Sequence, residues 1–146
     1  MTLRLPACML PAVLLVGCAT GYHSANNPIL GYTGGYWDTH GPGSTIKVGF
    51  SGNGFITGEK VGTYLLYRCA EVTKREGGSH FVLYQSLVDA VADRRSSERT
   101  VRTIGGKPAT YAYIWIVAGD EDGALSADDI LARLGPEVKP VSKGTQ

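Results

Sequence analysis

The stretch over residues 46–76 constrains the fold of this chain more than any other. Over residues 46–50 every second residue is apolar, which is the period-2 pattern of a half-buried strand. A turn follows at residues 51–54, where Ser-Gly and Asn-Gly steps favour positive φ and let the chain reverse. Thr57 stands where a helix N-cap is expected, ahead of a helical apolar spacing that stops before Gly77. The sequence therefore predicts a strand, a glycine turn and a long helix in succession.

Length and charge limit the classes of protein that this chain can form. Its 146 residues, 43% of them hydrophobic, are enough to bury one core. The formal net charge is +1, and without Arg4 the 14 basic residues become 13, which balance the 13 acidic ones. Nucleic-acid binding normally requires a clustered basic surface, so no nucleic-acid partner is expected. Twenty glycines in a chain of this length favour many turns and much β structure.

The first residues have the three-part layout of a secretory signal. Arg4 precedes an apolar run over residues 5–16, which is shorter than the ~20 residues that a membrane-spanning helix requires. The run ends in Leu-Val-Gly-Cys, which resembles the bacterial lipobox, where the cysteine is acylated and the chain is cut just before it. We therefore expect residues 1–17 to be a lipoprotein signal peptide and Cys18 to be the lipidated N-terminus. The alternative is an ordinary signal peptide that happens to end in cysteine.

The residues around the lipobox also bear on sorting and on disulfides. Ala19 stands where an aspartate signals retention in the inner membrane, so the resemblance implies transfer to the outer membrane. Of the three cysteines, Cys8 lies in the removed segment and Cys18 would carry lipid, which leaves Cys69. No disulfide is then expected within the mature chain, and Cys69 is predicted to be a small buried residue of the long helix.

The rest of the chain predicts a tether, further strands and a short helix. Residues 18–30 are small and polar without an apolar period, which is typical of a flexible tether. Strands are predicted at residues 36–39, 80–85 and 110–117. The strand predicted at residues 80–85 could continue toward Val91.

Both faces of the segment 110–117 are apolar, so it is predicted to be a covered inner strand. Its aromatic residues are interpreted as sheet core in preference to a ligand-stacking platform. The charged stretch 93–107 is interpreted as a solvated loop or an exposed hairpin arm. A short helix capped by Ser126 is predicted to stop at residues 135–136, and residues 136–146 are predicted to be a disordered tail.

Three motifs together resemble a family of small uncharacterised proteobacterial lipoproteins. These are the lipobox, a Phe-x-Gly-Asn-Gly turn at residues 50–54 and an Arg-x-Ala-Glu-x-Thr helix at residues 68–73. The resemblance covers roughly residues 18–85, implies a cell-envelope location and carries no established activity. The residues expected to have structural roles are Gly52, Asn53, Gly54, Thr57, Arg68 and Glu71. Arg68 and Glu71, three residues apart on one helix, are expected to pair.

Two near matches to chemical motifs have simpler structural interpretations. Gly52 and Gly54 before a helix resemble a dinucleotide-binding turn, but Thr57 replaces the third glycine. Asp120, Asp122 and Asp129 fall at ligand positions of a calcium-loop pattern whose first position is an alanine. An acidic loop that caps the following helix is the simpler interpretation. No cofactor and no catalytic residue is expected, and the three aspartates stay calcium candidates.

These patterns predict one α+β domain over residues 31–135. Its small, mainly antiparallel sheet would carry one long and one short helix on one face, in the order β-β-α-β-β-α. The expected location is the outer membrane, lipid-anchored and facing the periplasm. The leading expectation is a non-catalytic interaction or structural role, with the membrane and an envelope protein as partners. A small-ligand or calcium-binding periplasmic sensor and an envelope enzyme are the alternatives.

Overall fold

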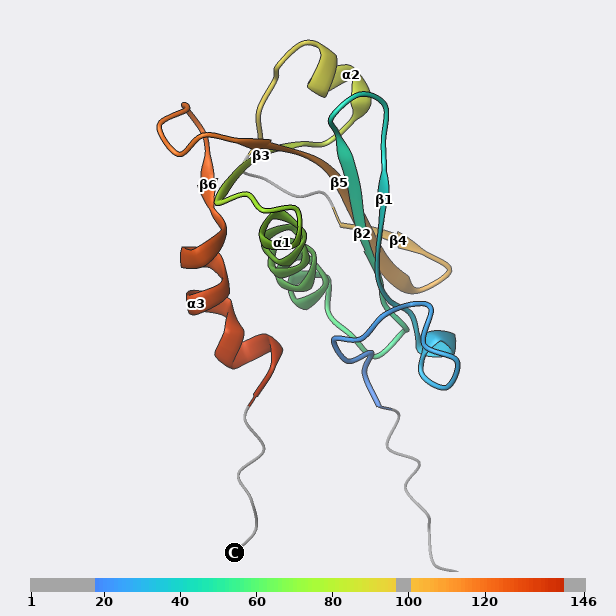
Figure 1. Cartoon of the computed structure of the whole chain (residues 1–146). Helices are drawn as coiled ribbons and strands as arrows, with labels where there is room; N and C mark the ends of the chain where they lie inside the picture. The colour runs from blue at the N-terminus through green and yellow to red at the C-terminus, as the bar shows by residue number, and fades with distance from the viewer. Residues whose placement is uncertain (1–17, 97–100, 141–146) are drawn as a thin grey trace, which may run out of the picture.

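The computed structural model describes residues 18–96 and 101–140 (Figure 1). A six-stranded antiparallel sheet and the helices that pack on it form an α+β fold, as predicted. The elements are η1 (Gly31–Thr33), β1 (Gly35–His40), β2 (Ile46–Ser51), α1 (Gly58–Arg75), β3 (His80–Tyr84), α2 (Leu87–Val91), β4 (Arg102–Ile104), β5 (Lys107–Val117), β6 (Leu125–Ser126) and α3 (Ala127–Val138). The predicted signal peptide over residues 1–17 lies outside the described residues.

β5 is the central strand of the sheet. The strand order is β1-β2-β5-β3-β6, and β4 forms a hairpin with the start of β5. Of the two interpretations of residues 93–107, a solvated loop or an exposed hairpin arm, the hairpin is confirmed for residues 102–107, while residues 97–100 lie outside the described residues. The first part of β5 pairs with β2 and its last part with β3, so β5 connects the two halves of the sheet.

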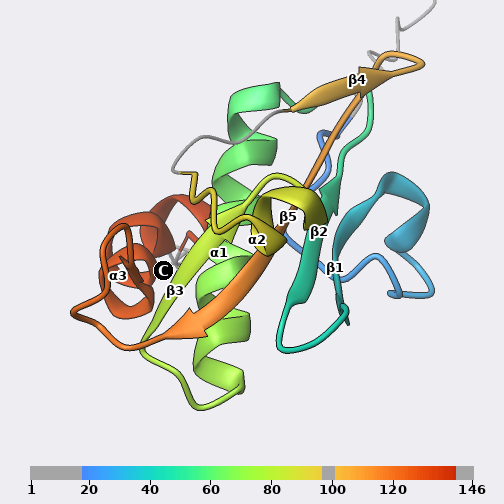
Figure 2. The ribbon, with the colours of Figure 1, turned by 90° about the horizontal axis from the view of Figure 1, so that it is seen from above.

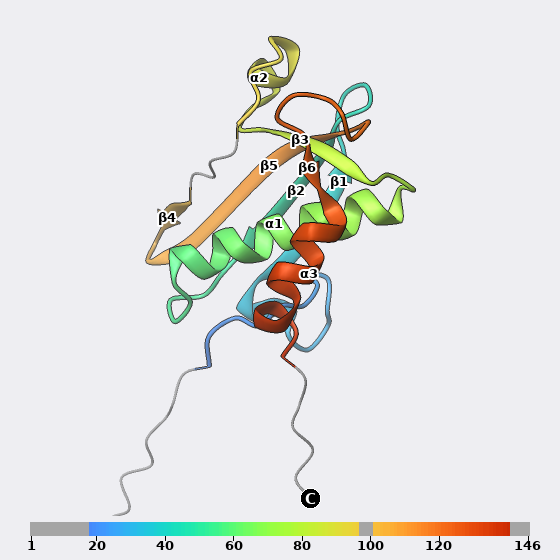
Figure 3. The same ribbon diagram turned by 90° about the vertical axis from the view of Figure 1, so that its left-hand side faces the viewer.

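α1 and α3 lie next to each other on one face of the sheet, in front of the strands in Figure 3. Seen from above, α3, α1 and the strands β2 and β1 follow one another across the molecule (Figure 2). Alternate side chains of β2 and β5 are buried toward α1, as period-2 alternation requires. The buried core between these layers contains Ile46, Val48, Leu65, Cys69, Ala70, Val72, Phe81, Leu83, Ala112, Ile114, Ala127 and Ile130.

The caps of the two larger helices confirm their predicted starts. Thr57 Oγ1 accepts a hydrogen bond from Lys60 N at 3.3 Å, and Ser126 Oγ accepts one from Asp129 N at 3.2 Å. The predicted end of α3 is wrong, because the helix continues through Pro136 to Val138. Val138 is 4% exposed and belongs to a cluster with Tyr67, so its burial offsets the hydrogen bond that the proline cannot make.

The glycine turn after β2 is present, but the reason predicted for its glycines is wrong. Neither Gly52 nor Gly54 has a positive φ. Gly52 is required by close packing, because a Cβ there would lie 2.2 Å from Ile56 Cγ2. Its backbone N–H also donates to the carbonyl oxygen of Pro108 at 2.8 Å, which ties the turn to the start of β5.

The flexible tether predicted over residues 18–30 is instead part of the folded domain. Backbone hydrogen bonds join His23 and Ala25 to Tyr36 of β1, at 2.8 and 2.9 Å. The Thr20 side chain is buried, with 2% of its surface exposed. The folded domain therefore includes residues 18–138, beyond both predicted boundaries at 31 and 135.

Candidate functional site

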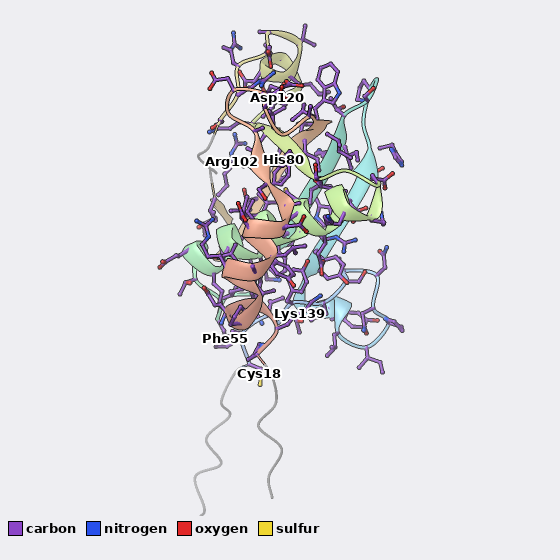
Figure 4. The ribbon with its side chains drawn as sticks, turned by 60° about the vertical axis from the view of Figure 1, so that its left-hand side comes forward. Cys18, Phe55, His80, Arg102, Asp120 and Lys139 are labelled. Atoms are coloured by element: carbon purple, nitrogen blue, oxygen red, sulfur yellow. The ribbon has the colours of Figure 1, made fainter. Side chains whose placement is uncertain are left out.

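Cys18, the predicted lipid-attachment residue, is held against the domain by the glycine turn. Asn53 Nδ2 donates to the carbonyl oxygen of Cys18 at 2.8 Å, and Asn53 Oδ1 accepts from Thr20 N at 3.2 Å. In return, Asn53 N donates to Thr20 Oγ1 at 2.8 Å, and the Thr20 hydroxyl donates to the carbonyl of Thr33. Cys18 itself is exposed and lies at one end of the molecule, with Phe55 beside it (Figure 4). Asn53, expected to have a structural role in the turn, thus also holds Cys18 and Thr20 against the domain.

The helix motif lies in a half-buried charged cluster. Arg68 Nη2 lies 2.6 Å from Asp38 Oδ1 of β1, and Arg68 Nη1 lies 3.1 Å from Glu71 Oε2. These three side chains are only 16%, 11% and 20% exposed, respectively. The guanidinium also stacks on the Tyr36 ring, 4.1 Å from its centroid. The predicted pairing of Arg68 with Glu71 is confirmed, whereas the pairing of Arg68 with Asp38 was not predicted.

Further groups join the cluster from both ends of the domain. The Tyr22 hydroxyl donates to Glu71, and so does the Lys139 ammonium just after α3. Arg75 Nη1 donates to Asp38 at 2.7 Å. The cluster therefore connects the N-terminal segment, β1, α1 and the end of α3. This arrangement indicates that it stabilises the packing of these segments.

The ionisation of the cluster agrees with this structural role. Burial raises the pKa of the Asp38 carboxyl, but hydrogen bonds from Arg68 and Arg75 outweigh it and hold the pKa below its usual range. Burial likewise raises the pKa of Glu71, and hydrogen bonds from Lys139, Tyr22 and Arg68 outweigh it. Burial, followed by the hydrogen bond to Glu71, raises the pKa of the Tyr22 hydroxyl. At neutral pH the carboxylates are thus ionised and the phenol is protonated.

Stability is expected to fall in acid. A carboxylate with a lowered folded-state pKa stabilises the fold above its unfolded pKa, and this contribution is lost as the pH falls through the folded value. The ordinary values are 3.8 for Asp38 and 4.5 for Glu71. The urea midpoint should therefore be steady down to about pH 5 and decline below it, with a shallower decline in Asp38→Asn. A midpoint that holds or rises from pH 5 to 3 would contradict this assignment.

The second surface that stands out is the sheet face opposite α1, which we call the aromatic face. It is formed by Trp37, Lys47, Tyr111, Tyr113 and Trp115. Tyr111 and Trp115 are 41% and 45% exposed. The prediction that both sides of this strand are covered is therefore wrong. The short helix α2, which replaces the predicted continuation of the third strand toward Val91, covers only the β3 side of this face, packing Ala90 with Val82 and Tyr84.

Lys47 lies at the centre of the aromatic face. Its Nζ is 4.4 Å from the centroid of the Tyr111 ring and 5.6 Å from those of Trp37 and Tyr113. The Trp37 ring lies against Gly49, where a Cβ would come within 2.1 Å of the ring. Glycine in the middle of β2 therefore permits this close approach, and the rings and the cation form one ordered surface.

No family model, curated protein or solved structure matches this chain. The resemblance to small envelope lipoproteins stays a prediction. Within residues 18–96 and 101–140, no helix is long and apolar enough to cross a bilayer.

The structure does not bring the calcium candidates together. Asp120 and Asp122 lie exposed in the turn after β5, and Arg95 donates to the carbonyl of Asp122 and pairs with Glu121 at 2.9 Å. An arginine at the loop opposes cation binding. Asp129 belongs instead to the first turn of α3, whose N-cap it contacts through its backbone N–H. Among the described residues, no three His, Cys, Asp or Glu side chains converge to hold a metal.

Asp129 lines an open hollow of about 420 Å³ between β3, β6 and α3. The other lining residues are His80, Gly119, Ala124, Leu125, Ser126, Ile130 and Arg133. Ser126 already accepts the α3 capping hydrogen bond, while Ser79 Oγ lies 3.0 Å from His80 Nδ1. The hollow can offer an imidazole and a guanidinium to a small polar molecule.

Proposed function

We propose that this protein is a lipid-anchored component of the bacterial cell envelope with a non-catalytic interaction role. In this proposal Cys18 carries the lipid and the aromatic face binds an envelope protein. The lipobox-like sequence before Cys18 supports the anchor. The observation that carries the interaction role is the exposure of Tyr111 and Trp115 on an ordered sheet face.

Exposed aromatic residues of this kind favour protein binding for a physical reason. Tryptophan and tyrosine bury large areas at little cost in side-chain entropy, and they dominate the binding energy of protein interfaces. A cation among the rings adds a charged contact that selects a partner. The face lies on the side of the sheet away from α1, and Figure 2 shows α1 and α3 together on the other side of β2 and β5.

Crosslinking in intact cells tests this role. A photo-reactive amino acid at position 111 should capture a specific partner, whereas the same group at the exposed position 132 of α3 should not. In the protein that carries the photo-reactive group at position 111, the further substitution Trp115→Ala should remove most of the crosslink. It should change the free energy of unfolding by no more than about 1 kcal/mol, because the Trp115 side chain is half exposed. Equal crosslinking at both positions, or an unchanged yield in Trp115→Ala, would argue against the aromatic face as the binding surface.

The hollow beside α3 favours a second function, the sensing of a small periplasmic ligand. His80 and Arg133 would contact such a ligand, and an anionic one would suit both groups. A ligand-dependent rise in melting temperature that is lost in Arg133→Ala would support this second function.

A further inference from the structure

We propose that the end of the domain carrying Cys18 sits directly on the bilayer, with four exposed apolar side chains placed in the lipid interface. These side chains, called here the membrane-seating patch, are Ile29, Leu30, Tyr32 and Phe55. The proposal rests on the proposed lipid anchor and adds the orientation of the domain on the membrane. Its partner surface is the headgroup region into which the acyl chains of Cys18 would lead.

The four side chains are unusually exposed for their size. Tyr32 is 95% exposed, Ile29 81%, Phe55 66% and Leu30 46%. The remaining large apolar side chains exposed in the described part of the chain lie elsewhere, on α2 and on the aromatic face. An apolar patch that stays in water is unfavourable, so its position next to the lipid-attachment residue indicates what covers it.

Hydrogen bonds connect the patch to Cys18. The Asn53 side chain that holds the Cys18 carbonyl also accepts from Phe55 N at 3.1 Å. Thr20 donates to the carbonyl of Thr33 in η1, the short turn that carries Tyr32. η1 and the start of the described chain accordingly lie at the same end of the molecule (Figure 1).

The loop before η1 is fixed as well. Asn27 Oδ1 accepts hydrogen bonds from Ile29 N and from Leu30 N, both at 2.9 Å. These two apolar residues are therefore presented by an ordered turn.

No flexible linker separates Cys18 from the domain, so the bilayer is the surface that would cover this patch. Acyl chains on Cys18 must enter the hydrocarbon, and residues 18–20 are bound to the domain, so the domain comes down to the headgroups. Apolar side chains then reach about 5–10 Å into the boundary between headgroups and acyl chains. Tyrosine is enriched at this depth because its ring is apolar and its hydroxyl polar.

Tryptophan reporters in the acylated full-length protein test this orientation. Phe55→Trp and Tyr32→Trp place reporters in the patch, and Val91→Trp places a control on α2, at the opposite end of the molecule (Figure 1). Each variant is reconstituted into vesicles of phosphatidylethanolamine and phosphatidylglycerol with brominated acyl chains. The fluorescence of the native Trp37 and Trp115 is measured in the parent protein and subtracted.

We expect the reporters at positions 55 and 32 to be quenched about twofold, and the reporter at 91 to be unaffected. Protein that floats with the vesicles while both patch reporters stay unquenched, or while position 91 is quenched equally, would overturn the seating and leave the anchor intact. Protein that carries no lipid and does not float would instead contradict the proposed anchor.

Discussion

A Cys18→Ser variant is expected to disappear from the membrane fraction. The lipobox reaction attaches lipid to the cysteine sulfur, so a serine at this position carries none. Each buried CH₂ contributes ~0.8 kcal/mol to membrane binding, and two or more acyl chains are needed for stable anchoring. Without them the patch of four apolar side chains would give at most weak, reversible binding. Fractionation of cells of a Gram-negative host measures the membrane association, and the intact mass of the protein measures whether lipid is attached.

Cys69→Ala is the matched control for this experiment. Cys69 is buried in α1, so the variant removes a sulfur without touching the N-terminus and should still sediment with outer membranes. The mass of the parent protein should correspond to a chain that starts at Cys18 and carries acyl groups. A parent protein that is soluble and unlipidated would contradict the anchor and bring a secreted or periplasmic ligand-binding role forward.

Arg68→Met is expected to be the most destabilising single change in the charged cluster. It keeps an apolar stem over Tyr36 but leaves the carboxylates of Asp38 and Glu71 without their shared partner. Removing one partner of a fully buried pair costs about 3–5 kcal/mol, and since these side chains keep some exposure we expect a loss of about 2–3 kcal/mol. The urea midpoint at pH 7 measures this loss.

Two further variants separate charge from packing. In Arg68→Met with Asp38→Asn, removal of the uncompensated carboxylate should recover part of the loss. Arg133→Met, at an exposed position of α3, should change the free energy of unfolding by no more than about 0.5 kcal/mol. Equal effects of Arg68→Met and Arg133→Met would show that the cluster contributes little to stability.

Much of the fold follows from local pattern. The alternation at residues 46–50 and the caps at Thr57 and Ser126 each operate within a few residues of sequence, and the structure confirms the elements that they predict. The predicted helix end at Pro136 and the predicted tether over residues 18–30 are wrong because the structure of both segments depends on distant contacts. Val138 packs on Tyr67, and Thr20 binds Asn53, across separations that no local pattern reports.

The candidate sites were less accessible to sequence reasoning. Asp38 and Lys139 lie far from Arg68 and Glu71 along the chain, and only the tertiary fold makes them partners. The aromatic face was missed because an apolar strand with two apolar sides is usually covered, whereas α2 is too short to cover Tyr111 and Trp115. One signal was available in the sequence, since Gly49 in the middle of a strand marks a close approach.

If Cys18 is acylated as proposed, the contact between Thr20 and Asn53 has a consequence for the order of events during maturation. A signal peptidase must hold several residues on each side of the bond that it cuts in an extended form, whereas Thr20 is buried in the folded domain. In that case acylation and cleavage at Cys18 would precede the docking of residues 18–20. Completion of the fold would then follow release from the processing enzymes, and only the acylated, cleaved chain would acquire its final compact form.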